Sequence, residues 1–457
     1  MKRHVNILLL SVLAMAFSAP IHAQALRSGY FMDGNFSRLQ LNPAFEADHS
    51  FLAFPLLSNL DIDVNANVGL GNFLFHNDFE DRLTTFMNSD VDANDFLGKL
   101  PLNTTLNQNF DMTLAAAGFR IGDGYATLAL NLHEDVMANV PYEFFKFAKC
   151  TFQYNDYHIR DLNLDVLSYA SLEAGYSRKI FDIIRVGGRV KLLAGLANLN
   201  FDLQQIDLTV DNSKWLLQAQ TNMNLAALGG VSVITNADGG YEDYELAGYI
   251  PSNWGAALDL GAEYHFKTVP GDLSISASVT NLGFIKWKKM LTCKPIDGTV
   301  TYDGMGTVDY DNLDNVESEL AQLEEDLMGM IHIDETEQIS MTTSIPTTLQ
   351  FGAEYKMPFY DALSVAALGT VRSNNVNPYK SFRGFVNISP LNWLQASVNV
   401  GASNYGTEFG WIVNIHPRAG LSLFVGSDYF ASRLSADYVP VDRVVANFAM
   451  GINVPIK

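Results

Sequence analysis

The sequence predicts an all-β protein: a transmembrane antiparallel β-barrel of about 14–16 strands, with an N-terminal plug segment and one helix in a long loop. Three observations lead to this prediction. Many segments alternate apolar and polar residues, they are mostly about 10–14 residues long, and short turns alternate with long loops between them. A period of two indicates strands with two unlike faces, and the length suits a lipid bilayer.

Residues 1–23 have the layout of a secretory signal peptide. Lys2 and Arg3 form a basic start, an apolar core follows over residues 5–19, and Ala23 offers a small residue for cleavage before Gln24. The apolar core is shorter than the roughly 20 residues that a membrane-spanning helix needs. We therefore expect export by a cleaved signal peptide, and the rest of the chain has no apolar run that could form a transmembrane helix.

Residues 24–57 are too irregular to form a lipid-facing strand. They contain six aromatic residues and an Asn42-Pro43-Ala44 turn, which indicates a packed segment rather than a disordered tail. Irregular backbone at membrane depth has to be covered by protein. We therefore predict that this segment is a plug, or hatch, inside the barrel.

The barrel is expected over residues 58–457, and residues 253–267 show its strand pattern most clearly. Trp254, Leu258, Leu260 and Tyr264 share one face, while the other face is polar or glycine. Trp254 and Tyr264 are about 33 Å apart along a strand, which is roughly 25 Å in height at a tilt of about 40°. This matches the apolar band of a membrane barrel. A soluble β-sandwich is the alternative, but its strands are usually only about 5–6 residues long.

The remaining strands follow from the same alternation and from turn residues such as Pro270-Gly271. The predicted strands are 61–70, 106–119, 125–132, 166–178, 184–197, 199–210, 214–227, 253–267, 272–285, 345–357, 362–372, 381–389, 392–401, 405–415, 420–430 and 444–456. From residue 120 onward, the long loops are 133–165, 228–252 and 286–344, and the last is the longest. An even number of strands puts both chain ends on the short-turn side, which is periplasmic in such barrels.

Loop 286–344 is expected to contain an amphipathic helix. Its apolar residues are spaced by three and four, at Leu313, Val316, Leu320, Leu323, Leu327 and Met330. Cys150 and Cys293 both fall in predicted long loops on one side of the membrane, so either a disulfide or two unpaired thiols fits the sequence.

Charged residues are expected on the lumen wall, because a charge facing lipid is costly. Two strands carry them on one face: Arg185, Arg189 and Lys191 on one, and Asp259, Glu263 and His265 on the other. We interpret them as an ion-pair lattice that fills the interior, with a transport site as the alternative.

Several classes of function are disfavoured. The net charge of −21 disfavours nucleic acid as a partner. The chain has no nucleophile elbow, phosphate-binding loop or zinc-protease motif, and two cysteines alone do not form a tetrahedral metal set. We therefore expect no enzyme activity, no catalytic residues, no cofactor and no metal.

Short motifs give the chain a resemblance to known proteins. The signal peptide, LNPAF at 41–45, TNLGFIKW at 280–287 and IPTTLQFGAEY at 345–355 resemble a family of uncharacterised, predicted outer-membrane barrel proteins. That family is similar in outline to the FadL-like long-chain fatty-acid transporters and to PorV of the type IX secretion system. One departure is the chain end, Pro455-Ile456-Lys457, where many barrels end on an aromatic residue.

The FadL-like resemblance implies a protein of the bacterial outer membrane, in contact with the lipid bilayer, that binds or passes a fatty acid or another hydrophobic small molecule. It implies a hatch turn at Asn42, Pro43 and Ala44. The candidate pocket residues beside that turn are Phe31, Phe36, Phe45, Phe51 and Phe54. The PorV-like alternative is an accessory protein that docks a secretion-system partner through its long loops. A structural barrel without cargo is the third possibility.

Overall fold

The structure is a computed structural model of the chain. It describes residues 26–55, 57–77, 82–88, 90–150, 156–181, 183–211, 214–235, 241–246, 248, 250–266, 270–293, 299–302, 339–373, 378–417, 420–429 and 443–456. The predicted signal peptide and the predicted helix of loop 286–344 lie outside the described residues.

Strands make up most of the described chain. They are β1 (Ser50–Ala53), β2 (Leu60–Ala66), β3 (Leu74–Asn77), β4 (Arg82–Thr85), β5 (Asn103–Ile121), β6 (Gly124–Pro141), β7 (Asp156–Ile180), β8 (Ile184–Asp211), β9 (Lys214–Ala227), β10 (Val231–Thr235), β11 (Tyr241–Leu246), β12 (Asn253–Phe266), β13 (Asp272–Cys293), β14 (Thr299–Tyr302), β15 (Ile339–Ser344), β16 (Thr348–Lys356), β17 (Leu363–Arg372), β18 (Tyr379–Leu391), β19 (Leu394–Ser403), β20 (Gly406–Ile415), β21 (Ser422–Ser427) and β22 (Val444–Ile456). The helices are short: η1 (Arg27–Gly29), α2 (Arg38–Leu41), η2 (Leu70–Asn72), α3 (Ala93–Leu97) and α4 (Tyr142–Cys150).

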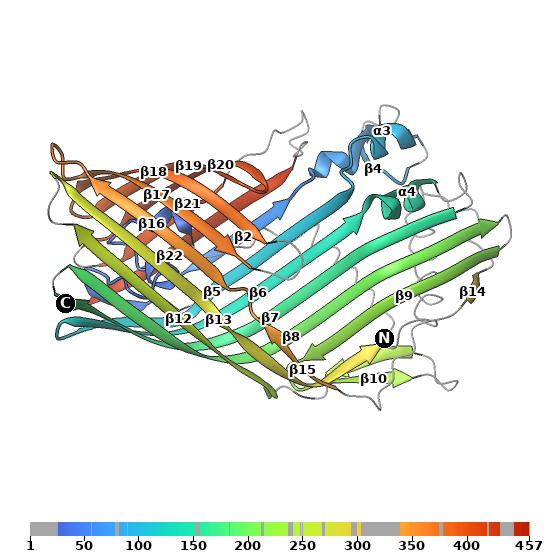
Figure 1. Ribbon diagram of the computed structural model, residues 1–457, viewed down its shortest axis with the longest axis horizontal. Coiled ribbons are helices and arrows are strands. Elements are labelled where there is room, and N and C mark those ends of the chain that lie inside the picture. The colour runs from blue at the N-terminus through green and yellow to red at the C-terminus, as the bar shows by residue number, and fades with distance from the viewer. Residues whose placement is uncertain are drawn as a thin grey trace.

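Eighteen of these strands form one antiparallel sheet that closes on itself (Figure 1). The ring closes where β1 and β2 pair with β22 on one side and with β5 on the other. Some strands lie end to end between the same neighbours: β9 and β12 both pair with β8, and β15 and β16 both pair with β13. The all-β barrel is therefore confirmed, and closure satisfies the backbone hydrogen bonds that a sheet edge in lipid would leave open.

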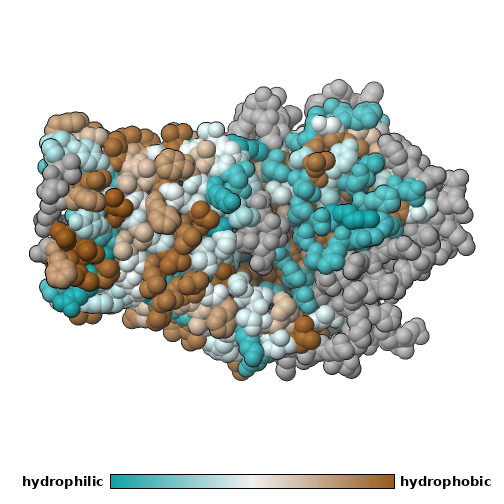
Figure 2. All heavy atoms as spheres, in the orientation of Figure 1, coloured by the Kyte–Doolittle hydropathy of each residue, from teal (hydrophilic) through white to brown (hydrophobic). Residues whose placement is uncertain are grey.

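Several predicted strand boundaries were wrong on one side of the barrel, where β13 also extends to Cys293 instead of ending at 285. The expected strands 184–197 and 199–210 are a single strand, β8, and β6 and β7 extend through most of the expected loop 133–165. Their extensions lie beyond the rest of the ring, at the end that carries α3 and α4 (Figure 1). The outer surface is hydrophilic there (Figure 2), so the alternation that marks a membrane strand fades, and residues such as 133–141 resemble a loop in sequence.

The outer surface divides into an apolar belt and a polar extension. Leu172, Val190, Leu260, Phe351 and Val400 are all exposed although they are large and apolar. Hydrophobic residues gather over the short-turn end and hydrophilic residues over the extension (Figure 2). Polar side chains are buried on the inside instead, among them Asp63, Asp259 and Glu408. Apolar outside and polar inside is the arrangement of a transmembrane barrel.

The extension carries a small aromatic core that the sequence analysis missed. Phe86 stacks on Phe96 of α3 at 4.3 Å between ring centroids, and Phe145 of α4 completes the cluster. Cys150 at the end of α4 is buried there as a free thiol, and the side chain of Cys293 lies outside the description. Among the described residues, no helix is both long and apolar enough to cross a membrane.

Candidate functional site

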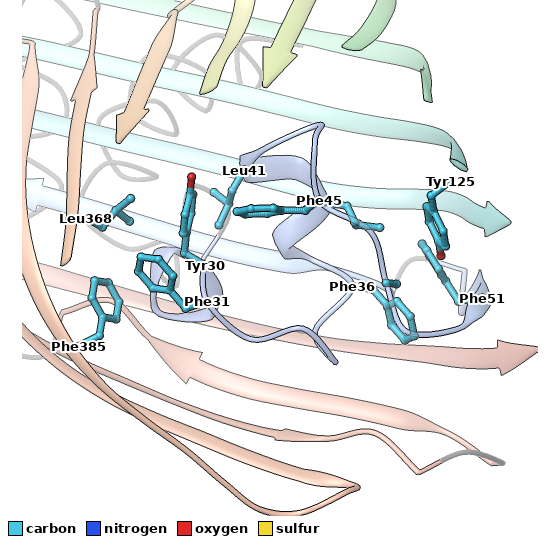
Figure 3. Close-up of a cluster of buried hydrophobic side chains, with 11 residues drawn as sticks. Tyr30, Phe31, Phe36, Leu41, Phe45, Phe51, Tyr125, Leu368 and Phe385 are labelled. Carbon is cyan, nitrogen blue, oxygen red and sulfur yellow. The ribbon is translucent and has the colours of Figure 1, made fainter. Parts of the chain in front are cut away.

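Residues 26–49 lie inside the ring and fill its short-turn half (Figure 3). Phe31, Phe36 and Phe45 are buried in one cluster with Tyr30, and the wall supplies Tyr125, Leu368 and Phe385. The rings of Tyr30 and Phe45 meet edge to face at 5.0 Å, and those of Phe31 and Phe385 at 5.3 Å. This core holds the interior segment, which we call the plug, against the wall.

The Asn42-Pro43-Ala44 turn is closed by its own side chain. The Asn42 Oδ1 atom accepts a hydrogen bond from the Ala44 amide at 2.9 Å, and the Phe45 amide donates to the Asn42 carbonyl at 3.1 Å. Asparagine and proline favour such turns, because asparagine bonds its own backbone two residues on and proline presets φ. The Nδ2 atom of Asn42 donates a hydrogen bond to the Tyr30 hydroxyl at 3.3 Å, which ties the turn to the rest of the plug.

Two glycines of the wall make room for this turn. Gly187 of β8 and Gly261 of β12 are direct partners across the two strands. A Cβ atom on Gly187 would lie 2.0 Å from the Pro43 carbonyl oxygen, and one on Gly261 would lie 2.0 Å from Asn42 Oδ1. The sequence analysis missed this docking place, although both glycines fall on the lumen face of their predicted strands.

We expect Gly187→Ala to lower the free energy of unfolding by about 1–3 kcal/mol, because its methyl group overlaps the plug backbone. Denaturant unfolding in lipid vesicles measures this. The matched control is Gly188→Ala, whose Cβ would meet its nearest atoms at an ordinary 3.6 Å and should leave stability within about 0.5 kcal/mol. Equal effects of the two substitutions would show that the turn does not rest on Gly187.

A buried ion network ties the start of the plug to the wall at β2 and at the end of β21. The Nε atom of Arg27 lies 3.0 Å from Asp428 Oδ2, and the Ser28 amide donates to Asp428 Oδ1 at 2.6 Å. A second wall carboxylate, Asp63 on β2, is 3.7 Å from the same guanidinium. All of these groups are almost completely buried, so the network is shielded from solvent screening.

The plug also reaches the short-turn mouth of the barrel. Asp33 contacts Arg38 of α2, and Lys356 at the end of β16 lies 3.5 Å from its other oxygen. Burial would raise the pKa of the Asp33 carboxyl, but the two cations outweigh it and hold that pKa at about 2.

Two of the predicted pocket residues lie outside the plug proper. Phe51 belongs to wall strand β1, yet its ring points inward and stacks on Phe36 with 4.4 Å between centroids. Phe54 follows β1, is 42% exposed and is absent from the buried cluster.

The six predicted lumen charges lie together on β8 and β12. Arg185 is 3.1 Å from Glu263, and both Arg189 and Lys191 bond Asp259, at 3.2 and 3.0 Å. The partly exposed His265 lies 3.2 Å from Glu263. The sequence analysis missed Glu173 of β7, which lies 3.4 Å from both Arg189 and Lys191 and completes the cluster.

Two cavities adjoin the plug on the side of β5 to β8. The smaller, of about 40 Å³, is mostly apolar and is lined by Phe36, Leu39, Phe51, Ala116 and Ala117, among others. The larger, of about 60 Å³, is more polar. It is lined by Arg27 and Leu41 of the plug and by wall residues such as Gln350.

Gln40 of α2 separates the two cavities. It lines both, together with the wall residues Glu173 and Arg189. Its Nε2 atom donates to Thr113 of β5 at 2.9 Å, and its Oε1 atom accepts from Asn59 at 3.1 Å. Next to Gln40, the buried Arg189 guanidinium also donates to the Leu39 carbonyl. The start of the plug is held differently, by the buried ion network of Arg27.

The described part of the chain offers no cluster of three or more His, Cys, Asp or Glu side chains arranged to hold a metal ion. The charged residues of the lumen pair with one another instead. Of the two cavities that Gln40 lines, one has a mainly apolar surface and the other a more polar one.

The sequence matches one protein-family model, described as "Family of unknown function (DUF5723)", over residues 43–428. This range covers most of the chain, from the hatch turn to the end of β21, and leaves out β22. No curated protein matches the sequence.

Similar solved structures include the toluene transporter TbuX of Ralstonia pickettii, the toluene transporter TodX of P. putida and a FadL homologue of Pseudomonas aeruginosa. Their identities to this chain are 9%, 9% and 11%, and their TM-scores are 0.43, 0.42 and 0.43. The alignments cover 95%, 96% and 96% of this chain and 95%, 99% and 99% of theirs.

Proposed function

The chain belongs to this family of unknown function, DUF5723, and we propose that it is a bacterial outer-membrane barrel that binds or passes a hydrophobic small molecule at its plug. The observation that carries the proposal is the apolar cavity between the plug and strands β5 and β6. It is lined by Phe36 and Phe51, two of the aromatic residues that the sequence singles out, and by Leu39, Ala116 and Ala117. Polar residues such as Asn59, Thr113 and Arg189 also line it, but most of its surface is apolar. A mainly apolar surface with a small number of placed polar groups is typical of ligand sites.

This cavity is too small to hold a ligand without a change in the structure. About 40 Å³ is far below the roughly 300–1,000 Å³ of ordinary ligand pockets. Binding therefore has to widen the cavity by moving the stacked rings of Phe36 and Phe51, or the plug backbone beside them. The ligand gains by burying its apolar surface, at about 25 cal/mol per Å².

The two attachments of the plug favour movement on the cavity side. There, Gln40 holds the plug to Thr113 and Asn59 through neutral hydrogen bonds, which contribute only about 0.5–1.5 kcal/mol each, and the Arg189 guanidinium donates to the Leu39 carbonyl. At the start of the plug, breaking the buried pair between Arg27 and Asp428 would cost about 3–5 kcal/mol. We propose that the plug stays anchored at Arg27 and yields beside Gln40.

Ala116→Leu tests the proposal by filling the cavity. Ala116 packs against the aromatic cluster, so a leucine there should occupy the space and lower the affinity for a hydrocarbon such as octane at least about tenfold. The measurement is displacement of an apolar fluorescent probe from the purified barrel in lipid nanodiscs. Ala115→Leu is the matched control, since Ala115 is exposed on the outer face of the same strand. If Ala116→Leu and the wild type bind octane equally well, the ligand site is elsewhere.

The PorV-like alternative stays a prediction. Its docking element, loop 286–344, lies mostly outside the described residues, apart from the end of β13 and the short strands β14 and β15.

A further inference from the structure

Two residues that line the polar cavity each carry a buried hydrogen-bonding atom that has no partner among the described residues. These atoms are Nη1 of Arg27, in the plug, and Oε1 of Gln350, on β16. Both residues line the cavity, and both are at least 98% buried. An unsatisfied buried polar atom costs about 1–3 kcal/mol, so such atoms usually mark a place where another group binds.

The two atoms need opposite partners. A guanidinium N–H can only donate a hydrogen bond, and an amide oxygen can only accept one. A group that satisfies both has to accept from Arg27 and donate to Gln350. Hydroxyl and carboxamide groups can do this, whereas a carboxylate has no hydrogen to donate and a hydrocarbon can do neither.

The charges around the cavity favour a neutral group. The other charged residues that line it, apart from His133, are Arg189, Lys191, Arg372, Asp111, Asp135 and Glu173. Each of these charges already has a counter-charge or a close polar partner. Arg189 and Lys191 pair with Glu173, Arg372 pairs with Asp135, and Asp111 contacts His133. An additional buried charge would be left uncompensated, which is costly.

The polar cavity adjoins the apolar one. Gln40, Glu173 and Arg189 line both, so the two cavities meet at these residues. We infer that the ligand is a neutral amphiphile. Its hydroxyl or amide head binds Arg27 and Gln350 in the polar cavity, and its apolar body lies against Phe36 and Phe51 in the apolar cavity. This inference rests on the proposed function, because it names the class of the same ligand.

A matched series of eight-carbon ligands tests the inference on the full mature chain in lipid nanodiscs. We expect 1-octanol to bind at least about tenfold more tightly than octane and than octanoate, since only the alcohol both donates and accepts without adding charge. Gln350→Met keeps the length of the side chain but removes the acceptor. It should weaken 1-octanol binding about tenfold, a larger loss than any change in octane affinity, because only the alcohol uses the acceptor.

Gln108→Met is the control, because Gln108 is a buried glutamine on β5 that lines neither of the two cavities. Octane or octanoate binding as tightly as 1-octanol to the wild type would overturn the inference and leave the proposed function intact. Equal losses of octane and 1-octanol affinity in Gln350→Met would also overturn it. If none of the three ligands binds, both the inference and the proposed function fail. The wild-type series decides the question even if the variant does not fold.

Discussion

Asp428→Asn is expected to lower the free energy of unfolding by about 3–5 kcal/mol, because it removes the main counter-charge of a buried cation. The Asp428 carboxylate accepts from the Arg27 amide at 2.9 Å, from the Arg27 Nε at 3.0 Å and from the Ser28 hydroxyl at 2.7 Å. An asparagine keeps one acceptor but brings an NH₂ group toward these donors. Arg27 would be left with Asp63, 3.7 Å away, as its nearest carboxylate.

Denaturant unfolding in lipid vesicles measures this loss, and two controls interpret it. Asp123→Asn makes the same chemical change at an exposed turn, where Asp123 is 3.6 Å from Arg178, and should cost less than about 0.5 kcal/mol. The double variant Arg27→Met/Asp428→Asn removes both partners and should be more stable than the sum of the two single losses predicts. A loss in Asp428→Asn as small as that in Asp123→Asn would mean that this network does not anchor the plug.

Leu260→Arg is expected to cost about 2–4 kcal/mol, because it would place a cation near the middle of the apolar belt. Leu260 lies on β12 between Trp254 and Tyr264, and its side chain is 47% exposed on the outer surface. On a soluble protein the same surface substitution would change stability by no more than about 0.5 kcal/mol. The prediction therefore tests whether this surface contacts lipid.

The measurement is folding into lipid vesicles followed by denaturant unfolding. Leu102→Arg is the matched control, since Leu102 is even more exposed, at 82%, but precedes the extension end of β5 outside the belt. We expect that variant to fold like the wild type. A tolerated Leu260→Arg would place the belt in water and contradict the barrel's membrane location.

The sequence predicted the belt well, because the lipid contact leaves a pattern in every strand that crosses it. Phe351 is exposed and its neighbour Gln350 is buried, as the alternation of residues 345–357 requires. The same pattern placed Asp259 and Arg189 on the lumen face, where they form an ion pair. Beyond the belt both faces of the wall can carry polar residues. The prediction therefore did not include the ends of β6, β7 and β8 that lie there.

The candidate site could be predicted only in part. The pair Asn42-Pro43 predicts a turn from the local sequence. The aromatic residues Phe36 and Phe51 indicate that their segment packs against other residues. No such local signal marks Gln40 or Gln350, which are two of the twelve glutamines in the sequence. Their importance comes from contacts with residues far away along the chain, such as Thr113 for Gln40.

The sequence by itself therefore determined the class of fold and the faces of its strands, since alternation and strand length are local properties set by lipid on one side and a polar interior on the other. Only the tertiary structure decided where the plug docks, which wall anchors it and where the two cavities meet. These depend on steric fit and on ion pairs between residues hundreds of positions apart, such as Arg27 and Asp428, and no local pattern encodes such pairings.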